Sequence, residues 1–147
     1  AQIVLLNRED VSTAIRQEEV GAGASKVARY GEVRSKLVGM QRKMAETTDL
    51  IMDGRDIGTV VLPNADAKIY LTASSIVRAK RRFLELQEKG VDCDLNQIEQ
   101  DIIARDEQDM NREISPLRQA EDAILVDSSD MSIDEVVETI KKIVKDC

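Results

Sequence analysis

A short segment in the middle of the chain places two carboxylates on either side of an arginine. Asp53 and Asp56 flank Arg55, and the segment directly follows the apolar run at residues 50–52. That run predicts a buried parallel strand, and open α/β sheets bind ligands at the carboxyl ends of such strands. A guanidinium there can hold a phosphate, and the carboxylates can accept hydrogen bonds from an amine or a hydroxyl. A strand-exit turn with a local Asp–Arg ion pair explains the same residues equally well.

Arginines also gather on two consecutive predicted helices. Residues three and four apart share a helix face, so each helix presents a charged group on one side. Two such helices could close as a lid over phosphates, since phosphoryl transfer depends mostly on positioning and on neutralising the transferring oxygens. Surface helices with Glu–Arg pairs are the competing interpretation, because acidic residues are interleaved throughout. The grouped residues are Arg78, Arg81 and Arg82 on the first helix and Arg105, Asp109 and Arg112 on the second.

A hydroxyl and a guanidinium lie nine residues apart in the first third of the chain. Ser25 and Arg34 could read the polar edge of a nucleotide base. A capping serine and a solvated arginine are the simpler explanation of this pair.

The elements that must position these groups alternate between apolar runs and amphipathic helices. Such alternation predicts βαβ units and a parallel sheet, hence an α/β fold. Helix starts are predicted at Ser74–Ser75 and, by capping-box spacing, at Asp94 and Ser132. Strands are expected at residues 3–6, 50–52, 69–71 and 123–126, a turn at 7–10, short helices over 12–28 broken near Gly21 and Gly23, and helices over 31–46, 74–90, 94–112 and from 132 onward.

Composition excludes several classes of function. The 147 residues carry a net charge of −7 and no histidine, so neither a histidine-dependent triad nor a His-ligated zinc site can form. Acidity and few aromatic residues argue against a nucleic-acid partner, and no apolar run approaches the roughly 20 residues of a membrane span. Two widely separated cysteines fit free thiols in a reducing cytoplasm, where we expect the protein. Local arginines in an acidic chain favour a small anionic ligand.

Taken in order, these segments resemble the bacterial cytidylate kinases, the (d)CMP kinase branch of the P-loop nucleoside monophosphate kinases. The most specific segment is residues 53–63, Asp-Gly-Arg-Asp-Ile-Gly-Thr-Val-Val-Leu-Pro, continued by residues 65–74. The resemblance covers essentially the whole chain. Residues 7–28 resemble the family's inserted monophosphate-binding domain, 78–90 its lid helix, 105–117 the returning helix and 123–129 the last core strand.

The resemblance implies a fold and a division of the chain. The fold is a three-layer α/β/α P-loop nucleoside monophosphate kinase with a parallel core sheet, an inserted monophosphate-binding domain and a helical lid. Residues 1–48 would be part of the insert, 49–77 core strands and signature loop, 78–112 the lid helices, and 113–147 the last core strand and helix.

The resemblance also implies roles for the candidate site residues. Arg55, Arg105 and Arg112 would be catalytic. Ser25, Arg34 and Asp56 would contact the cytosine ring and its exocyclic amine. Arg55 would bind the monophosphate, and Asp53 would orient the neighbouring arginines. Arg105 and Asp109 would approach the ribose, and Arg112 the phosphates. Arg81 and Arg82 would belong to the lid over ATP.

The chain departs from the family pattern in one large respect. The phosphate-binding motif G-x-x-x-x-G-K-[ST] does not occur in it, and Gly21-Ala-Gly-Ala-Ser-Lys26 lacks its spacing. We therefore expect a core sheet without its first strands, whose unpaired edges favour association, and these 147 residues alone are expected to be inactive.

The implied activity is transfer of the γ-phosphoryl group of ATP to CMP or dCMP, with Mg²⁺ accompanying ATP and no metal site in this chain. The intact family would be monomeric, with no nucleic-acid or membrane partner. Two alternatives stay open: a catalytically inactive fragment able at most to bind a nucleoside monophosphate, and a related kinase of the uridylate or shikimate type.

Overall fold

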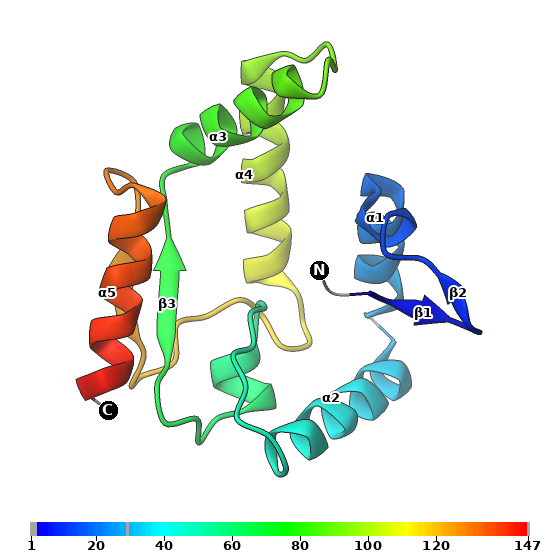
Figure 1. Ribbon diagram of the computed structural model, residues 1–147, viewed down its shortest axis with the longest axis vertical. Coiled ribbons are helices and arrows are strands. Elements are labelled where there is room, and N and C mark those ends of the chain that lie inside the picture. The colour runs from blue at the N-terminus through cyan, green and yellow to red at the C-terminus, as the bar shows by residue number, and fades with distance from the viewer. Residues whose placement is uncertain (1–2, 29, 147) are drawn as a thin grey trace. The chain divides into compact units, whose positions relative to one another are not determined.

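A computed structural model describes residues 3–28 and 30–146 (Figure 1). The side chains of residues 18, 22 and 25 lie outside the described part. The chain divides into two compact units, Ala1–Leu50 and Ile51–Cys147, which are described separately.

The first unit begins with a hairpin and continues with helices. β1 (Leu5–Leu6) pairs antiparallel with β2 (Glu9–Asp10). Asn7 and Arg8 between them have φ values of 52° and 74°, the left-handed conformation that two-residue hairpin turns require. The turn predicted at residues 7–10 is thus confined to residues 7–8, since residues 9–10 form β2, and the first strand is shorter than expected. The short helix η1 (Ala14–Arg16) follows.

Two helices complete the first unit. α1 (Glu18–Val27) runs without interruption through Gly21 and Gly23, so the predicted break is wrong. Each glycine costs only about 1 kcal/mol relative to alanine in a helix, which weakens a helix without ending it. α2 (Gly31–Ala45) confirms the helix predicted over 31–46.

The second unit is built on two parallel strands, as the sequence predicts. β3 (Ile69–Thr72) pairs with β4 (Ile124–Asp127), in a register that places Ile69 opposite Ile124 and Thr72 opposite Asp127. Both strands therefore end at the same edge of the sheet. α5 (Ile133–Asp146) follows β4, and the single π-helical turn η2 (Ile57–Val61) precedes β3.

Residues 50–52 do not form the predicted strand. They have irregular backbone, and Ile51 is 99% exposed. A parallel strand exists only when a neighbour accepts and donates its hydrogen bonds, and among the described residues β3 and β4 pair only with each other. An apolar run alone does not supply that partner.

A helical hairpin leaves the carboxyl end of β3. α3 (Ser75–Glu88) leads away, and α4 (Leu95–Asn111) returns beside it (Figure 1). Gly90, with φ of 72°, ends the first helix in the left-handed conformation that glycine tolerates. The Asp94 carboxylate accepts a hydrogen bond of 2.8 Å from the Gln97 N–H, confirming that cap.

The start of α3 differs from the prediction in one detail. Ser74 occupies the N-cap position without a side-chain capping bond. The Ser75 hydroxyl instead donates to Glu99 of α4 at 2.8 Å. The hydroxyl expected to begin one helix therefore joins two helices.

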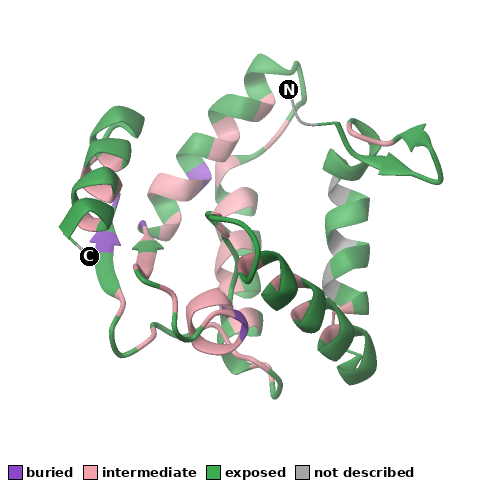
Figure 2. Cartoon of the chain, turned by 60° about the horizontal axis from the view of Figure 1, so that its bottom comes forward, coloured by how far each residue is buried: buried purple, intermediate pink, exposed green. Residues whose placement is uncertain are grey.

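The core of the second unit is small. Figure 2 shows few fully buried segments, and most helical surface is exposed or half-buried. Among the described residues the buried apolar side chains are Val61, Ala73, Ala79 and Val126, and the buried polar ones are Asp56 and Ser128.

Glu135→Gln is expected to destabilise the chain at pH 7 and to matter progressively less toward pH 3. Glu135 accepts hydrogen bonds of 2.8 Å from both the N–H and the hydroxyl of Ser132, which confirms the predicted capping box. These bonds lower the pKa of Glu135 below its ordinary 4.5. Because the folded-state pKa is the lower one, the stabilisation is complete above about pH 4.5 and is lost as the pH falls through the lowered pKa.

Urea unfolding followed by circular dichroism at pH 7 and pH 3 measures this change. Asp134→Asn removes the same charge from the first turn of the same helix without touching the cap, and serves as the control. An equal loss of stability in both variants at pH 7 would show that the capping box contributes nothing beyond its charge.

Candidate functional site

The centre of the candidate site joins the 53–56 segment to the end of α4. The Nε of Arg55 donates a hydrogen bond of 2.8 Å to Oδ2 of Asp109. The two residues are 54 positions apart in the sequence. Arg55 is largely exposed, and the Asp109 side chain is mostly buried. The guanidinium is thus held along one edge while its terminal nitrogens stay accessible to a ligand.

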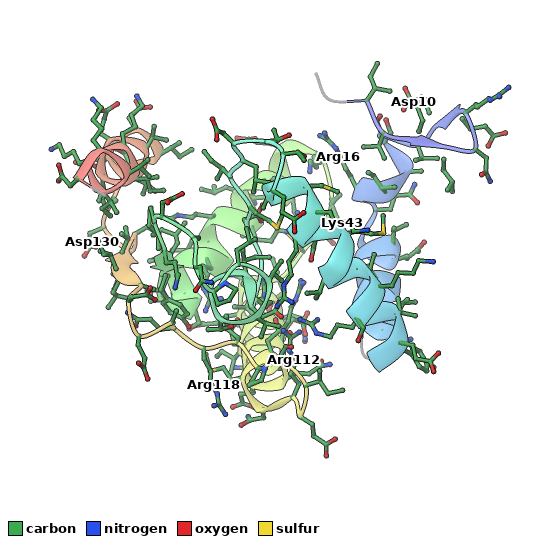
Figure 3. All side chains as sticks on the ribbon, turned by 90° about the horizontal axis from the view of Figure 1, so that it is seen from below. Asp10, Arg16, Lys43, Arg112, Arg118 and Asp130 are labelled. Carbon is green, nitrogen blue, oxygen red and sulfur yellow. The ribbon has the colours of Figure 1, made fainter. Side chains whose placement is uncertain are left out.

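Arg112 is the second guanidinium of this centre (Figure 3). Its Nε donates to the carbonyl oxygen of Ser115 at 2.5 Å. Its Nη1 lies 4.0 Å from Oδ1 of Asp109, and its Nη2 lies 4.0 Å from Oδ1 of Asp56. Among the described residues, Nη2 is a buried nitrogen with no hydrogen-bond partner. A buried, charged donor without a partner is costly unless a ligand completes it.

Asp56 is buried, at 7% exposure, although it ends an irregular segment directly before η2. Its position depends on η2, where its carbonyl oxygen accepts from the N–H groups of Val60 and Val61 at 2.8 and 3.2 Å. Such π-helical turns are rare and often occur at functional sites. Gly54 permits the close packing beneath the segment, because a Cβ there would lie 2.9 Å from Cγ1 of Ile57.

Two arginines of α3 bind the edge of the sheet where both strands end. Arg78 donates to the carbonyl oxygen of Ala73 at 2.9 Å and pairs with both carboxylate oxygens of Asp106 at 3.0 and 2.5 Å. This pairing with Asp106 raises the pKa of Arg78 above its ordinary value. Arg81 donates to the carbonyl oxygens of Ser128 and Met131 at 2.6 and 3.3 Å. The carboxyl ends of β3 and β4 are therefore tied to α3.

The other predicted site residues are less closely linked to this centre. Arg82 pairs with Glu85 within α3 at 3.0 Å. Asp53 and Arg105 are exposed, and neither forms an ion pair with another described residue. In this structure the carboxylate on Arg55 is that of Asp109. The roles expected for these residues stay predictions.

Ser25 and Arg34 belong to the first unit. Arg34 lies in the first turn of α2 and is half-buried. Ser25 lies in α1, and its side chain is outside the described residues. Their predicted contact with a base stays a prediction.

Two contacts of this site were not predicted from the sequence. The pairing of Arg78 with Asp106 spans 28 positions, and no local spacing signals it. Ser115, whose carbonyl oxygen holds Arg112, has a φ of 51° that its residue type does not indicate. The following Pro116 predicts the opposite, because it restricts the residue before it to extended conformations.

Fold and site together define the class of this protein. It is an α/β protein with parallel strands, in which Arg55 is hydrogen-bonded to Asp109 and Arg112 lies 4.0 Å from both Asp56 and Asp109. Arginine forks of this kind suit the oxygens of phosphate.

Comparison with known proteins specifies the family. The family model described as cytidylate kinase matches residues 1–146, and the chain belongs to that family of P-loop nucleoside monophosphate kinases. Three relatives named cytidylate kinase illustrate the similarity. That of Caldicellulosiruptor bescii is 55% identical over 139 residues, covering 95% of this chain and 62% of the relative. That of Lactobacillus gasseri is 53% identical over 144 residues, covering 98% and 63%. That of Pseudomonas aeruginosa is 51% identical over 139 residues, covering 95% and 61%.

The chain thus spans about 62% of the length of these relatives. In the part that the structure describes, no helix is long and apolar enough to cross a membrane. The same part contains no cluster of three or more side chains able to hold a metal ion.

Proposed function

We propose that this chain forms the acceptor side and part of the lid of a cytidylate kinase, which transfers the γ-phosphoryl group of ATP to CMP or dCMP. One observation carries the proposal most strongly. Arg112 has a buried Nη2 without a hydrogen-bond partner among the described residues, between Asp56 and the Asp109 that also holds Arg55. A phosphate oxygen is the group that would complete it.

Each residue of the centre has a chemical task in this proposal. Arg55 and Arg112 bind phosphate oxygens and neutralise the charge that builds up during transfer. Asp109 fixes the direction of the Arg55 guanidinium and lies 4.0 Å from Nη1 of Arg112. Asp56, buried beside Arg112, accepts a hydrogen bond from the exocyclic amine of cytosine.

The transfer itself needs no strong base. An oxygen of the monophosphate attacks the γ-phosphorus in line, and the bond from that phosphorus to the ADP oxygen breaks. Mg²⁺ arrives with ATP as part of the substrate and supplies charge neutralisation to its phosphates. The residues of this chain orient the acceptor and stabilise the transferring group.

A substrate panel tests the proposal on a protein in which a P-loop segment precedes these 147 residues. ADP formation is measured with CMP, dCMP, UMP and shikimate as acceptors. We expect kcat/KM for CMP or dCMP to exceed that for UMP by at least about tenfold. A carboxylate placed to accept a hydrogen bond from the amine of cytosine disfavours the carbonyl that uracil has in the same place. Equal use of UMP, or a preference for shikimate, would contradict the cytidylate assignment.

The 147 residues alone serve as the second arm of the same experiment. They are expected to bind CMP weakly and to give no turnover, since the motif that cradles the ATP phosphates is not in this sequence. Turnover by the chain alone would contradict the assigned division of labour.

A further inference from the structure

Ser115 has a backbone conformation that its sequence position disfavours. Its φ is 51°, whereas a residue that precedes proline is ordinarily restricted to extended conformations with negative φ. Non-glycine residues in the left-handed region are uncommon, and they concentrate at sites where the surrounding structure holds them. Pro116 therefore makes this conformation more costly rather than less.

The consequence of the conformation is visible at Arg112. The Ser115 carbonyl oxygen points back to the end of α4 and accepts the hydrogen bond of 2.5 Å from the Arg112 Nε. A second bond, 2.8 Å from the Leu117 N–H to the carbonyl oxygen of Asp109, closes the same turn onto the helix. The chain beyond α4 thus folds back over the residues that carry the site.

This contact determines which nitrogens of Arg112 face the site. The guanidinium is planar, so fixing Nε fixes the directions of Nη1 and Nη2. With Nε occupied by Ser115, Nη1 and Nη2 lie 4.0 Å from Asp109 and Asp56 respectively. Nη2 stays buried and without a hydrogen-bond partner in the described structure.

We propose that the turn at residues 115–117 is a positioning element, in which the left-handed conformation of Ser115 holds the Arg112 guanidinium ready for a phosphate. The element acts through the Ser115 backbone carbonyl. The proposal rests on the proposed function for the identity of the ligand, but its geometric part does not.

Three substitutions at position 115 distinguish the effect of the backbone conformation from the effect of the side chain. Glycine and asparagine tolerate positive φ, whereas a β-branched residue does not. We expect Ser115→Gly and Ser115→Asn to retain the Arg112 orientation and Ser115→Val to lose it. The control is Gly90→Val, which imposes the same backbone conflict at φ of 72° far along the same unit without touching Arg112.

The first readout is exchange of the Arg112 Nε–H with water, measured by NMR on the full 147-residue chain without ligand. We expect exchange at least about tenfold slower than for the exposed Arg118 in the unsubstituted chain, and loss of that protection in Ser115→Val, because the left-handed conformation is disfavoured by about that factor. Gly90→Val should keep the protection. An unprotected Arg112 in the unsubstituted chain, or equal protection in Ser115→Val, would overturn the proposal.

The second readout is kinetic, on the protein with a P-loop segment upstream. Ser115→Val should lower kcat with CMP by about tenfold and leave KM for ATP within about twofold. In an Arg112→Ala background the same substitution should have no further effect on kcat. An undiminished effect in that background would overturn the proposal. A positive exchange result without any binding of CMP would leave the positioning element in place and refute the proposed function instead.

Discussion

Arg112→Ala is expected to lower kcat for phosphoryl transfer to CMP by about 10²- to 10³-fold, the range found when a preorganised charged donor to a transferring group is removed. The reason lies in the position of the side chain. Nη2 is buried and has no hydrogen-bond partner among the described residues, and the proposed function assigns a phosphate oxygen of the substrate to it. The effect should fall on kcat more than on KM, because phosphate charge shifts most in the transition state.

Steady-state kinetics with the P-loop segment present measure this effect. Arg118→Ala is the matched control, since Arg118 is an exposed arginine six residues further along the chain. Arg112→Lys should recover only part of the loss, because an ammonium cannot bind Ser115 and a phosphate oxygen in the same fork geometry. An unchanged kcat in Arg112→Ala would refute the role assigned to this residue.

Asp56→Asn is expected to lower kcat/KM for CMP by about 10²-fold while changing ATP binding by less than about twofold. The substitution preserves shape but turns part of an acceptor into a donor, and sites built to hydrogen-bond one partner discriminate strongly when that pairing fails. Burial increases the penalty, because water cannot replace the lost partner at a side chain only 7% exposed. Arg112 would also lose its neighbouring charge 4.0 Å away.

Separate titrations of CMP and ATP distinguish the base-contacting role from a general loss of folding. Asp66→Asn, at an exposed aspartate near the same segment, supplies the control. Equal losses for CMP and ATP would contradict a specific contact of Asp56 with the acceptor base.

The local elements were predictable because their signals are local. Ser132 with Glu135, and Asp94 with Gln97, are capping patterns complete within four residues. The runs that became β3 and β4 were recognisable because each is a continuous apolar stretch that ends in polar residues.

Predictions failed where the outcome depends on a partner distant in the sequence, or where a residue lowers the stability of a helix only slightly. Residues 50–52 have the composition of a strand but no neighbour to pair with in the described structure. Gly21 and Gly23 weaken α1 without ending it. The helix propensity of glycine corresponds to a cost of only about 1 kcal/mol relative to alanine, and contacts elsewhere in the helix can outweigh it.

The centre of the site was predictable in its residues but not in its pairings. Arg55, Asp56, Asp109 and Arg112 were all expected to carry the chemistry, and the structure brings these four together. That Asp109 holds Arg55, and that a strained serine holds Arg112, depends on contacts between segments whose spacing carries no periodic signal.

The most direct measurement is a titration of the 147-residue chain with CMP, followed through the NMR signals of its arginine Nε–H groups. We expect the signals of Arg55 and Arg112 to shift together and to saturate with one affinity, while that of Arg118 does not move. Cytidine, which lacks the phosphate, should leave both unchanged at the same concentration. A saturating response to CMP that leaves Arg55 and Arg112 unmoved, or an equal response to cytidine, would contradict the claim that these two guanidinium groups form the phosphate site.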